Sequence, residues 1–288
     1  MDKTNIGNRM KKYYEEVSKT RLMRRCPVAI RLDGKSFHTF TKHMIKPFDE
    51  ILIKTMQETT KYLCENIQGC VLGYTQSDEI TLILVDYAKL DTDAWFNYEV
   101  QKLCSVSASM ATMAFNREFS HQINKYKEGR SELRKDGKWT SHNDNYYQTL
   151  CKARDKGAMF DSRCFNVPKD EVTNLIYWRQ LDATRNSINM VAQNYFSHKE
   201  LQGKSCNEMQ DMLMTKKGIN WNNYPIYQKR GTCVVRNEIK KQYSNSLVIS
   251  EKRISHVPES EWIIDKEIPI FRGSDRRYIE DIIIYQEY

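Results

Sequence analysis

The stretch Val71-Leu-Gly-Tyr-Thr-Gln-Ser-Asp-Glu-Ile-Thr-Leu-Ile-Leu-Val85 decides the fold of this chain. Two apolar runs, 71–74 and 80–85, flank the polar centre Gln76-Ser-Asp-Glu79. Short apolar runs that are rich in β-branched residues and bounded by turn-forming residues are typical of buried strands. The stretch therefore predicts a β-hairpin that carries two adjacent carboxylates, Asp78 and Glu79, at its tip.

This carboxylate pair has two interpretations: a solvated acidic turn, or a site for a hard cation such as Mg²⁺, which takes carboxylate oxygens. A second acidic element, Val28-Ala-Ile-Arg-Leu-Asp-Gly-Lys-Ser-Phe-His38, favours the cation site. Its strand-like run ends at Asp33 and Gly34, a turn signal. Two aspartates that meet at one sheet edge, beside Lys and Ser donors, are typical of phosphoryl and nucleotidyl transfer. Gly34 would also let backbone N–H groups approach a phosphate.

The remaining patterns predict an α+β fold. A helix should open at Lys46-Pro-Phe-Asp-Glu50, which places proline and acidic residues in the first turn, and a second helix should run from about Trp95 to Phe119 after an N-cap at Asp93. With a last strand at Phe160–Val167, these elements give a ferredoxin-like, split βαβ arrangement. We expect a polymerase-palm-like antiparallel sheet, covered by helices on one side, with the carboxylates on the open side and extra helical and C-terminal elements.

Other segments allow less specific predictions. Residues 7–25 look helical, and the basic cluster Arg21, Arg24 and Arg25 is either a solvated face or a phosphate-facing patch. Residues 120–157 are read as a basic loop or insertion, either solvated or contacting RNA. A helix should run from 168 through 180, residues 181–188 should follow it, and a further helix should continue to His198; a short helix should follow Ser205, and 226–235 resembles a strand pair. We expect a catalytic domain at 1–236 and a C-terminal extension of unknown role at 237–288.

The composition narrows the class of protein. Of 288 residues, 28% are charged and 40% are hydrophobic, and the net charge of +8 favours a polyanionic partner. The eight cysteines form no Cys-x-x-Cys pair, which argues against a structural zinc site and suggests reduced thiols in a cytoplasmic protein. The N-terminus lacks an apolar signal core and no run approaches transmembrane length, so we expect no membrane partner.

Four motifs occur together and in order: Arg31-Leu-Asp-Gly-Lys-Ser-Phe-His38, Lys46-Pro47, Gln76-Ser-Asp-Glu79 and Trp178-Arg-Gln180. In combination they closely resemble the tRNA-histidine guanylyltransferase superfamily over residues 7 to 236. Enzymes of that superfamily add nucleotides in the reverse, 3′-to-5′ direction at tRNA 5′ ends. Their palm-like fold agrees with the layout predicted from the patterns.

The resemblance implies that Asp33, Asp78 and the Gly34 carbonyl bind two Mg²⁺ ions, and that Asp33, Asp78 and Glu79 form the catalytic set, with Glu79 supporting the site. It also implies tRNA, at its 5′ end and acceptor stem, and ATP, GTP or other nucleoside triphosphates as substrates, and a homotetramer built from dimers. The implied nucleotide-binding residues are Asp33, Gly34, Lys35, Ser36, Phe37, His38, Lys46, Ser77, Asp78 and Lys102. The candidate RNA-binding residues are Arg185, Asn186 and Lys204.

Two side chains keep alternative interpretations: His38 as a structural histidine or a nucleotide contact, and Trp178 as a core residue or a base-stacking surface. One departure from the family pattern bears on the reaction. Eukaryotic members carry His-Ile-Asn-Asn where this chain has Thr184-Arg-Asn-Ser187, and Asp182–Ile188 instead resembles the bacterial and archaeal "like-protein" branch. Template-dependent repair of 5′ ends is therefore favoured over addition of a single G to tRNA-His. A palm-type nucleotide cyclase and a non-catalytic RNA-binding module remain alternatives from other classes.

Overall fold

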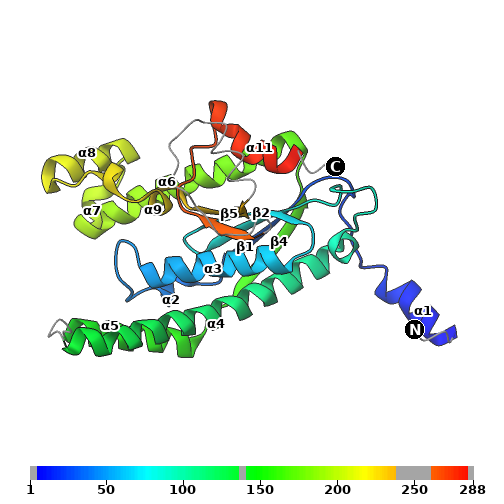
Figure 1. Cartoon of the computed structure of the whole chain (residues 1–288), viewed down its shortest axis with the longest axis horizontal. Helices are drawn as coiled ribbons and strands as arrows, with labels where there is room; N and C mark the ends of the chain where they lie inside the picture. The colour runs from blue at the N-terminus through cyan, green and yellow to red at the C-terminus, as the bar shows by residue number, and fades with distance from the viewer. Residues whose placement is uncertain (1–4, 136–140, 238–260, 285–288) are drawn as a thin grey trace.

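A six-stranded antiparallel sheet forms the middle layer of the computed structural model, which describes residues 5–135, 141–237 and 261–284 (Figure 1). The strand order is β4-β1-β3-β2-β5-β6. The strands are β1 Val28–Gly34, β2 Cys70–Gln76, β3 Glu79–Leu84, β4 Phe160–Asn166, β5 Thr232–Arg236 and β6 Trp262–Asp265.

The first four strands and two helices confirm the predicted ferredoxin-like core. Helix α3, Glu50–Asn66, connects β1 to β2, and helix α4, Val100–Lys135, connects β3 to β4. Strands β2 and β3 form the predicted hairpin, closed by the two residues Ser77 and Asp78. Because β1 pairs with both β3 and β4, the end of β1 lies directly beside this hairpin turn.

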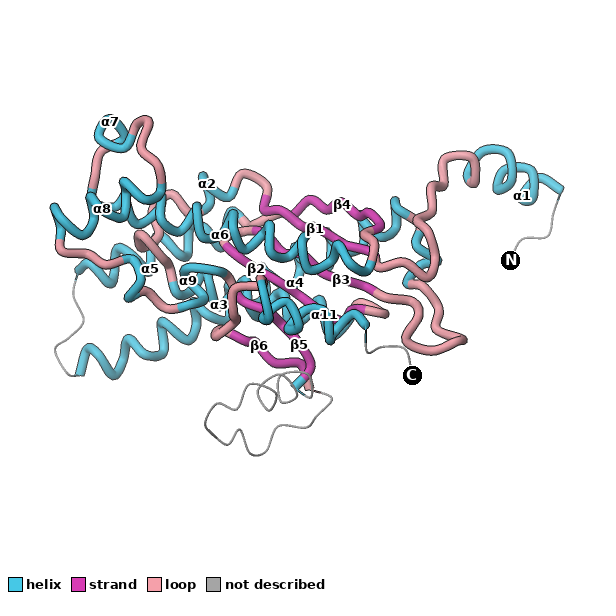
Figure 2. The backbone as a smooth tube through the Cα atoms, turned by 90° about the horizontal axis from the view of Figure 1, so that it is seen from above, coloured by secondary structure: helices cyan, strands magenta, loops and turns pink. Residues whose placement is uncertain are grey.

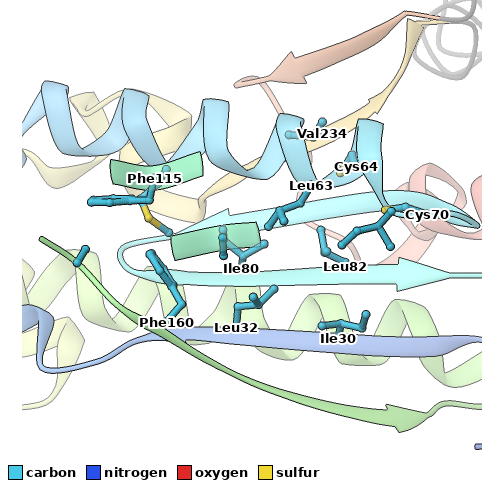
Figure 3. Packing of buried hydrophobic residues seen from close by; sticks show 14 of the residues in the cluster. Ile30, Leu32, Leu63, Cys64, Cys70, Ile80, Leu82, Phe115, Phe160 and Val234 are labelled. Atoms are coloured by element: carbon cyan, nitrogen blue, oxygen red, sulfur yellow. The ribbon is translucent and has the colours of Figure 1, made fainter. Parts of the chain in front are cut away.

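Helices α3 and α4 cover one face of the sheet (Figure 1). Alternate side chains of the strands, among them Ile30, Leu32, Ile80 and Leu82, are almost completely buried against these helices (Figure 3). This is the period of two that a strand with one face on a core requires. The main core therefore forms one rigid wall beneath the predicted aspartates.

The prediction of a basic loop over 120–157 is wrong, because the described part of this segment is helical. Helix α4 continues to Lys135, and helix α5, Ser141–Lys156, packs on α4 through the buried side chains of Tyr146, Leu150 and Ala153. Lys, Glu and Arg are good helix formers, so a basic segment needs only a narrow apolar stripe to fold as a helix. Residues 136–140 lie outside the described residues.

Helices also cover the second face of the sheet, so the expected open side is covered over much of its area. The helices on this face are α6, Val172–Tyr195, and α11, Arg277–Ile284 (Figure 1). Ala29 and Ile83 point into this second core. Helix α6 is continuous through residues 180–188, where two separate helices were predicted.

The C-terminal part of the chain joins the same sheet. Residues 226–230 form a short helix, α9 Ile226–Arg230, where the first strand of a pair was predicted, and only β5 follows as a strand. Pro225 precedes this helix and Gly231 ends it with a φ of 82°, and a proline before a helix and a glycine after it are typical start and stop signals. Strand β6 then pairs with β5, so the predicted boundary at residue 236 falls between two paired strands.

The N-terminal segment extends away from the sheet (Figures 1 and 2). It consists of α1, Asn5–Met10, and a π-helical turn, η1 Lys11–Glu15, and it buries none of its residues; the helix therefore ends well before residue 25. The basic cluster that follows is structural in part, because the Arg24 guanidinium lies 2.6 Å from the buried carboxylate of Asp86 and the Arg25 backbone N–H donates to the same carboxylate.

The remaining short elements complete the fold. The expected helix start at Trp95 is a 3-10 turn, η2, whose N-cap is Ala94 and not Asp93, and the α-helix begins at Val100. Within the described residues, no helix combines the length and apolar character needed to cross a bilayer. The other elements are α2 Phe37–Phe40, η3 Lys169–Glu171, α7 His198–Leu201, α8 Cys206–Lys217, η4 Trp221–Asn223 and η5 Gly273–Arg276.

Candidate active site

The two predicted metal-binding aspartates lie at the same end of the sheet. Asp33 pairs in register with Glu79, the first residue of β3, and the Gly34 N–H donates a hydrogen bond to the Asp78 carbonyl at 3.1 Å. The pairing of β1 with β3 therefore brings two segments that are distant in sequence into direct contact.

A cavity of about 550 Å³ opens beside these aspartates. This size lies within the range that small-molecule ligands such as nucleotides occupy. Most of the residues predicted to be catalytic or to bind nucleotide line this cavity, but Lys35, Glu79 and Lys102 do not. The predicted residues that line it are Asp33, Gly34, Ser36, Phe37, His38, Lys46, Ser77 and Asp78, joined by Thr41, Met44, Ile45, Pro47, Asp49, Leu52 and Met190.

Two serines at the cavity adopt left-handed backbone conformations. Ser36 has φ 56° and ψ 36°, and Ser77 has φ 51°. Such a conformation costs about 1–2 kcal/mol for a residue with a Cβ, and it is found disproportionately at functional sites. The fold therefore holds the two turns that carry these serines in conformations that isolated serines would avoid.

Gly34 is required by packing and not by a left-handed backbone. A Cβ at this position would lie 2.2 Å from Cδ2 of Phe37, whose ring folds back over the glycine. The Phe37 ring also packs against Phe40, Phe115 and Phe160 at centroid distances of 5.1, 5.4 and 5.3 Å. The loop that follows Asp33 is therefore fastened to the main core by an aromatic cluster.

Neighbouring carboxylates concentrate negative charge at the site, which favours binding of a cation. Burial raises the pKa of Asp33, and the carboxylates of Glu79 and Asp161, its partners on both neighbouring strands, raise it further. Burial also raises the pKa of Asp78, although a hydrogen bond from Ser77 partly opposes the effect. Both carboxyls are thus harder to ionise than free aspartate until a positive charge offsets them.

The donor set fits Mg²⁺. Among the described residues, no group of three or more His, Cys, Asp or Glu side chains is arranged to hold a metal ion. Mg²⁺ does not need such a cage, because it usually keeps several waters and binds one or two carboxylates together with substrate phosphates. Asp33 and Asp78, with the Gly34 carbonyl, are the residues that would provide that smaller set of oxygens.

Glu79 supports the turn and does not line the cavity. Its carboxylate lies 3.3 Å from Nη2 of Arg31 and 2.5 Å from Nη2 of Arg179. Arg179 is 3% exposed and also pairs with Asp182 at 2.7 Å, so helix α6 is tied to the hairpin. This network was not predicted from the sequence, because its members come from β1, β3 and α6, which are distant along the chain.

Asp49 is a second anchor that the sequence did not single out as functional. Its carboxylate caps α3 by accepting from the Leu52 N–H at 3.0 Å, and it also accepts from the Ile45 N–H at 3.1 Å and from the Tyr146 hydroxyl at 2.6 Å. These bonds fix the loop that carries Lys46. An N-cap aspartate was detectable from the helix start, but its tyrosine partner on α5 was not.

The remaining predicted residues are dispersed. Lys102 lies near the beginning of α4, at the sheet end opposite the hairpin turn, with its ammonium over the Phe96 ring at 5.7 Å (Figure 1). It therefore does not line the cavity of its own chain, and its predicted contact with a nucleotide stays a prediction. Lys204 is exposed and pairs with Glu208 at 3.1 Å, and the exposed Arg185 pairs with Asp182.

The positions of Asn186, Trp178 and His38 bear on the roles predicted for them. Asn186 lines a smaller cavity of about 80 Å³ that shares Asp49 and Ser77 with the first cavity. Trp178 is 50% exposed, so it is not a core residue, and its ring lies 5.4 Å from the Arg31 guanidinium. His38 is exposed and lines the main cavity, which excludes a buried structural role.

An antiparallel ferredoxin-like sheet that presents paired aspartates beside a nucleotide-sized cavity defines a palm-type nucleotidyltransferase. Comparison with known proteins identifies the family. The family model for tRNA(His) guanylyltransferase matches residues 7–168, and the chain belongs to this family. The prediction that the protein is an enzyme is therefore confirmed, and the alternative of a non-catalytic RNA-binding module is not.

Three relatives illustrate the match. A bacterial tRNA(His) guanylyltransferase-like protein in complex with ATP is 40% identical, with a TM-score of 0.73 over 97% of this chain and 99% of that one. A bacterial like-protein in complex with GTP is 37% identical, with a TM-score of 0.70 over 98% and 100%. The tRNA(His) guanylyltransferase of Saccharomyces cerevisiae is 27% identical over 238 residues, 75% of this chain and 84% of the yeast protein.

Proposed function

We propose that this enzyme adds nucleotides in the 3′-to-5′ direction to the 5′ end of tRNA, choosing each nucleotide by pairing with the opposite strand. The observation that carries the proposal is the convergence of Asp33 and Asp78 at one cavity with Ser36, Ser77 and Lys46 around it. Similarity to bacterial like-proteins in complex with ATP and with GTP supports nucleoside triphosphates as its substrates.

Bound at Asp33, Asp78 and the Gly34 carbonyl, two Mg²⁺ ions would supply activation of a hydroxyl and neutralisation of triphosphate charge. In the transfer itself, the 3′-hydroxyl oxygen of the incoming nucleotide forms a bond to the α-phosphorus of the RNA 5′ end. The bond to the leaving group breaks, which releases pyrophosphate from a 5′-triphosphate end or AMP from a 5′-adenylylated end. The hydroxyl proton passes to solvent.

The residues of this chain position those reactants. Lys46, on the loop fixed by Asp49, places an ammonium group at the cavity wall, where it offsets the negative charge of a triphosphate. The serine turns at 36 and 77 bring hydroxyl and backbone groups to the same wall. An RNA that begins with a 5′-monophosphate would first be activated with ATP in the same site.

The segment 182–188 supports template-dependent repair in particular, because it follows the like-protein pattern and only Asn186 matches the eukaryotic motif. Asn186 lies at the cavity next to the site, so a difference in this segment is well placed to affect nucleotide choice. A homotetramer is proposed as well: the N-terminal segment exposes Ile6, Tyr13 and Val17 by 65%, 61% and 77%, which is apolar surface that a second copy could cover.

The test uses a tRNA transcript that lacks its first nucleotide, with ATP, Mg²⁺ and each nucleoside triphosphate offered singly. Extension only by the nucleotide that pairs with the opposite base, lost in Asp78→Ala, is the expected result. Extension by GTP alone, whatever the opposing base, would establish a guanylyltransferase that adds a single G. Steady nucleotide consumption without RNA extension would establish a cyclase-type reaction.

A matched binding measurement separates chemistry from recognition. Asp78→Ala should bind the same RNA as tightly as the wild type, because Lys and Arg side chains provide most of the affinity for a polyanion. If RNA binding is lost together with activity, the division of roles between the aspartates and the basic residues is wrong.

A further inference from the structure

A third cavity, of about 230 Å³, adjoins the reaction site on the far side of Ser36. Its lining consists of Lys35, Ser36, Phe40 and the segment 156–159. Ser36 lines both this cavity and the main cavity, and Lys35, predicted as a nucleotide contact, lines this third cavity and not the main one. The segment 33–36 therefore borders two adjacent cavities, with Ser36 between them.

Hydrogen bonds hold the backbone that lines this third cavity. The Lys35 N–H donates to the Met159 carbonyl at 2.9 Å, which joins the end of β1 to the loop before β4. Asn116 of α4 holds the same loop by donating to the Ala158 carbonyl and accepting from the Ala158 N–H, both at 2.9 Å. The backbone around the cavity is thus preorganised.

Its charge is one-sided. Lys35 and Lys156 are exposed lysines from different elements that line one cavity. Among the described residues, neither forms an ion pair, and the neighbouring Asp155 carboxylate is held by Arg154 at 2.9 Å. Two unneutralised ammonium groups at one cavity attract an anion, and a phosphate group accepts hydrogen bonds from both.

The size and position indicate which phosphate it takes. The cavity is smaller than the 300–1,000 Å³ typical of sites for whole small-molecule ligands, so it suits part of a polymer better than a second nucleoside triphosphate. Ser36 is three residues beyond Asp33, which places it within about 10 Å of the reacting centre. Met159, 59% exposed at the rim, offers a polarisable surface for a base.

We propose that Lys35 and Lys156 form a subsite for a backbone phosphate of the RNA strand whose 5′ end reacts, within the first three internucleotide linkages. The proposal rests on the proposed function, since it takes the 5′ end to lie at Asp33 and Asp78. Its role is to hold the strand while a nucleotide is added. The subsite contacts neither the transferred phosphorus nor the incoming nucleotide.

The experiment measures equilibrium binding of a 5′-truncated tRNA in EDTA without nucleotide, so it does not depend on extension. Lys35→Gln/Lys156→Gln keeps most of each stem and removes both charges. We expect affinity to fall about tenfold and the slope of log K against log salt to decrease by about 1. The matched control is Lys152→Gln, an exposed lysine one turn earlier on α5 that does not line the cavity.

Chemical substitution of the RNA locates the contact. A tRNA assembled from a synthetic 5′ segment carries a neutral methylphosphonate at the first, second or third linkage. At one linkage the wild type should lose about tenfold in affinity and Lys35→Gln/Lys156→Gln should lose none. Two results would overturn the subsite in favour of a diffuse basic surface. In the first, the loss of affinity from the methylphosphonate and the loss from Lys35→Gln/Lys156→Gln multiply at all three linkages. In the second, Lys152→Gln loses as much affinity as Lys35→Gln/Lys156→Gln.

The last part of the experiment measures the affinity of the variant for ATP. We expect it to be unchanged in Lys35→Gln/Lys156→Gln, and a variant that loses ATP binding while keeping RNA binding would assign the cavity to a triphosphate and overturn the proposal. A failure of the proposed function is recognised separately. In that case no RNA is extended by the wild type, whatever the binding cycle shows.

Discussion

Substitution of Gly34 by alanine tests why a glycine follows the first aspartate. The new Cβ would lie 2.2, 2.5 and 2.7 Å from three atoms of the Phe37 ring. To reach an ordinary contact of about 3.5 Å, the ring must move by more than 1 Å, away from its positions against Phe40, Phe115 and Phe160. Overpacking of this kind costs about 1–3 kcal/mol, and each disturbed aromatic pair adds about 0.5–1.5 kcal/mol.

We therefore expect Gly34→Ala to lower the free energy of unfolding by about 3 kcal/mol, measured by urea denaturation in EDTA so that metal binding does not contribute. The control is Gly129→Ala on α4, where a Cβ meets nothing within 4 Å. That substitution should stabilise the protein by up to about 1 kcal/mol, because alanine is a better helix former than glycine.

A double mutant separates the clash from other causes. Phe37→Leu removes the ring that the new Cβ would meet, so Gly34→Ala/Phe37→Leu should be more stable than the sum of the two single effects by at least 1 kcal/mol. If the two effects add, or if Gly34→Ala is as stable as the wild type, the reasoning from Phe37 is refuted. The glycine would then serve close approach of a ligand to the backbone.

Three further predictions follow from buried groups. In EDTA, Asp78→Asn should melt at a higher temperature than the wild type at pH 7, and this advantage should shrink as pH falls toward 4, because the raised pKa of Asp78 makes its ionised form destabilising above that range; equal melting temperatures at pH 7 would contradict it. Tyr146→Phe should lower the free energy of unfolding by about 1–3 kcal/mol and raise KM for the nucleoside triphosphate, since the buried Asp49 carboxylate loses a 2.6 Å hydrogen bond; steady-state kinetics with an unchanged KM would limit the hydroxyl to a structural role. Burial raises the pKa of the Cys64 and Cys233 thiols, so iodoacetamide at pH 8 should label them only after urea is added, and mass spectrometry that finds them labelled in the native protein would disprove their burial.

Much of the sheet could be predicted from the sequence because its signals are local. The apolar runs of the hairpin and of β1, and the polar residues that end them, specify strands and turns within a few residues. The order of the first four strands, β4-β1-β3-β2, is then that of the split βαβ arrangement, in which a helix joins β1 to β2 and another joins β3 to β4. The meeting of Asp33 and Asp78 is a consequence of this order.

The rest depended on contacts between distant segments. Helix α5 was missed although its buried residues Tyr146, Leu150 and Ala153 have helical spacing, because the surrounding residues are mostly polar or charged. The predicted nucleotide contact of Lys102 stays a prediction, because a residue carried over from a family pattern comes without its position relative to the cavity of one chain.

Glu79 shows that the direction of a side chain is also difficult to predict from the sequence. Its neighbour Asp78 lines the cavity, yet Glu79 turns to Arg31 and Arg179. Adjacent residues at the start of a strand point in different directions, so two consecutive carboxylates have different surroundings. A sequence motif alone assigns both to the site.

The position of helix α11 affects how this protein can be made. Tyr278, Ile279, Ile282 and Ile283 of this helix fill the core on the second face of the sheet. They are synthesised after every described strand, so a nascent chain that has completed β1 to β5 has only α6 on this apolar sheet face and still lacks the part of the cover that α11 provides. Protection of that face by chaperones during translation, and a low tolerance for premature stop codons near residue 277, are the cellular consequences of placing the last helix there.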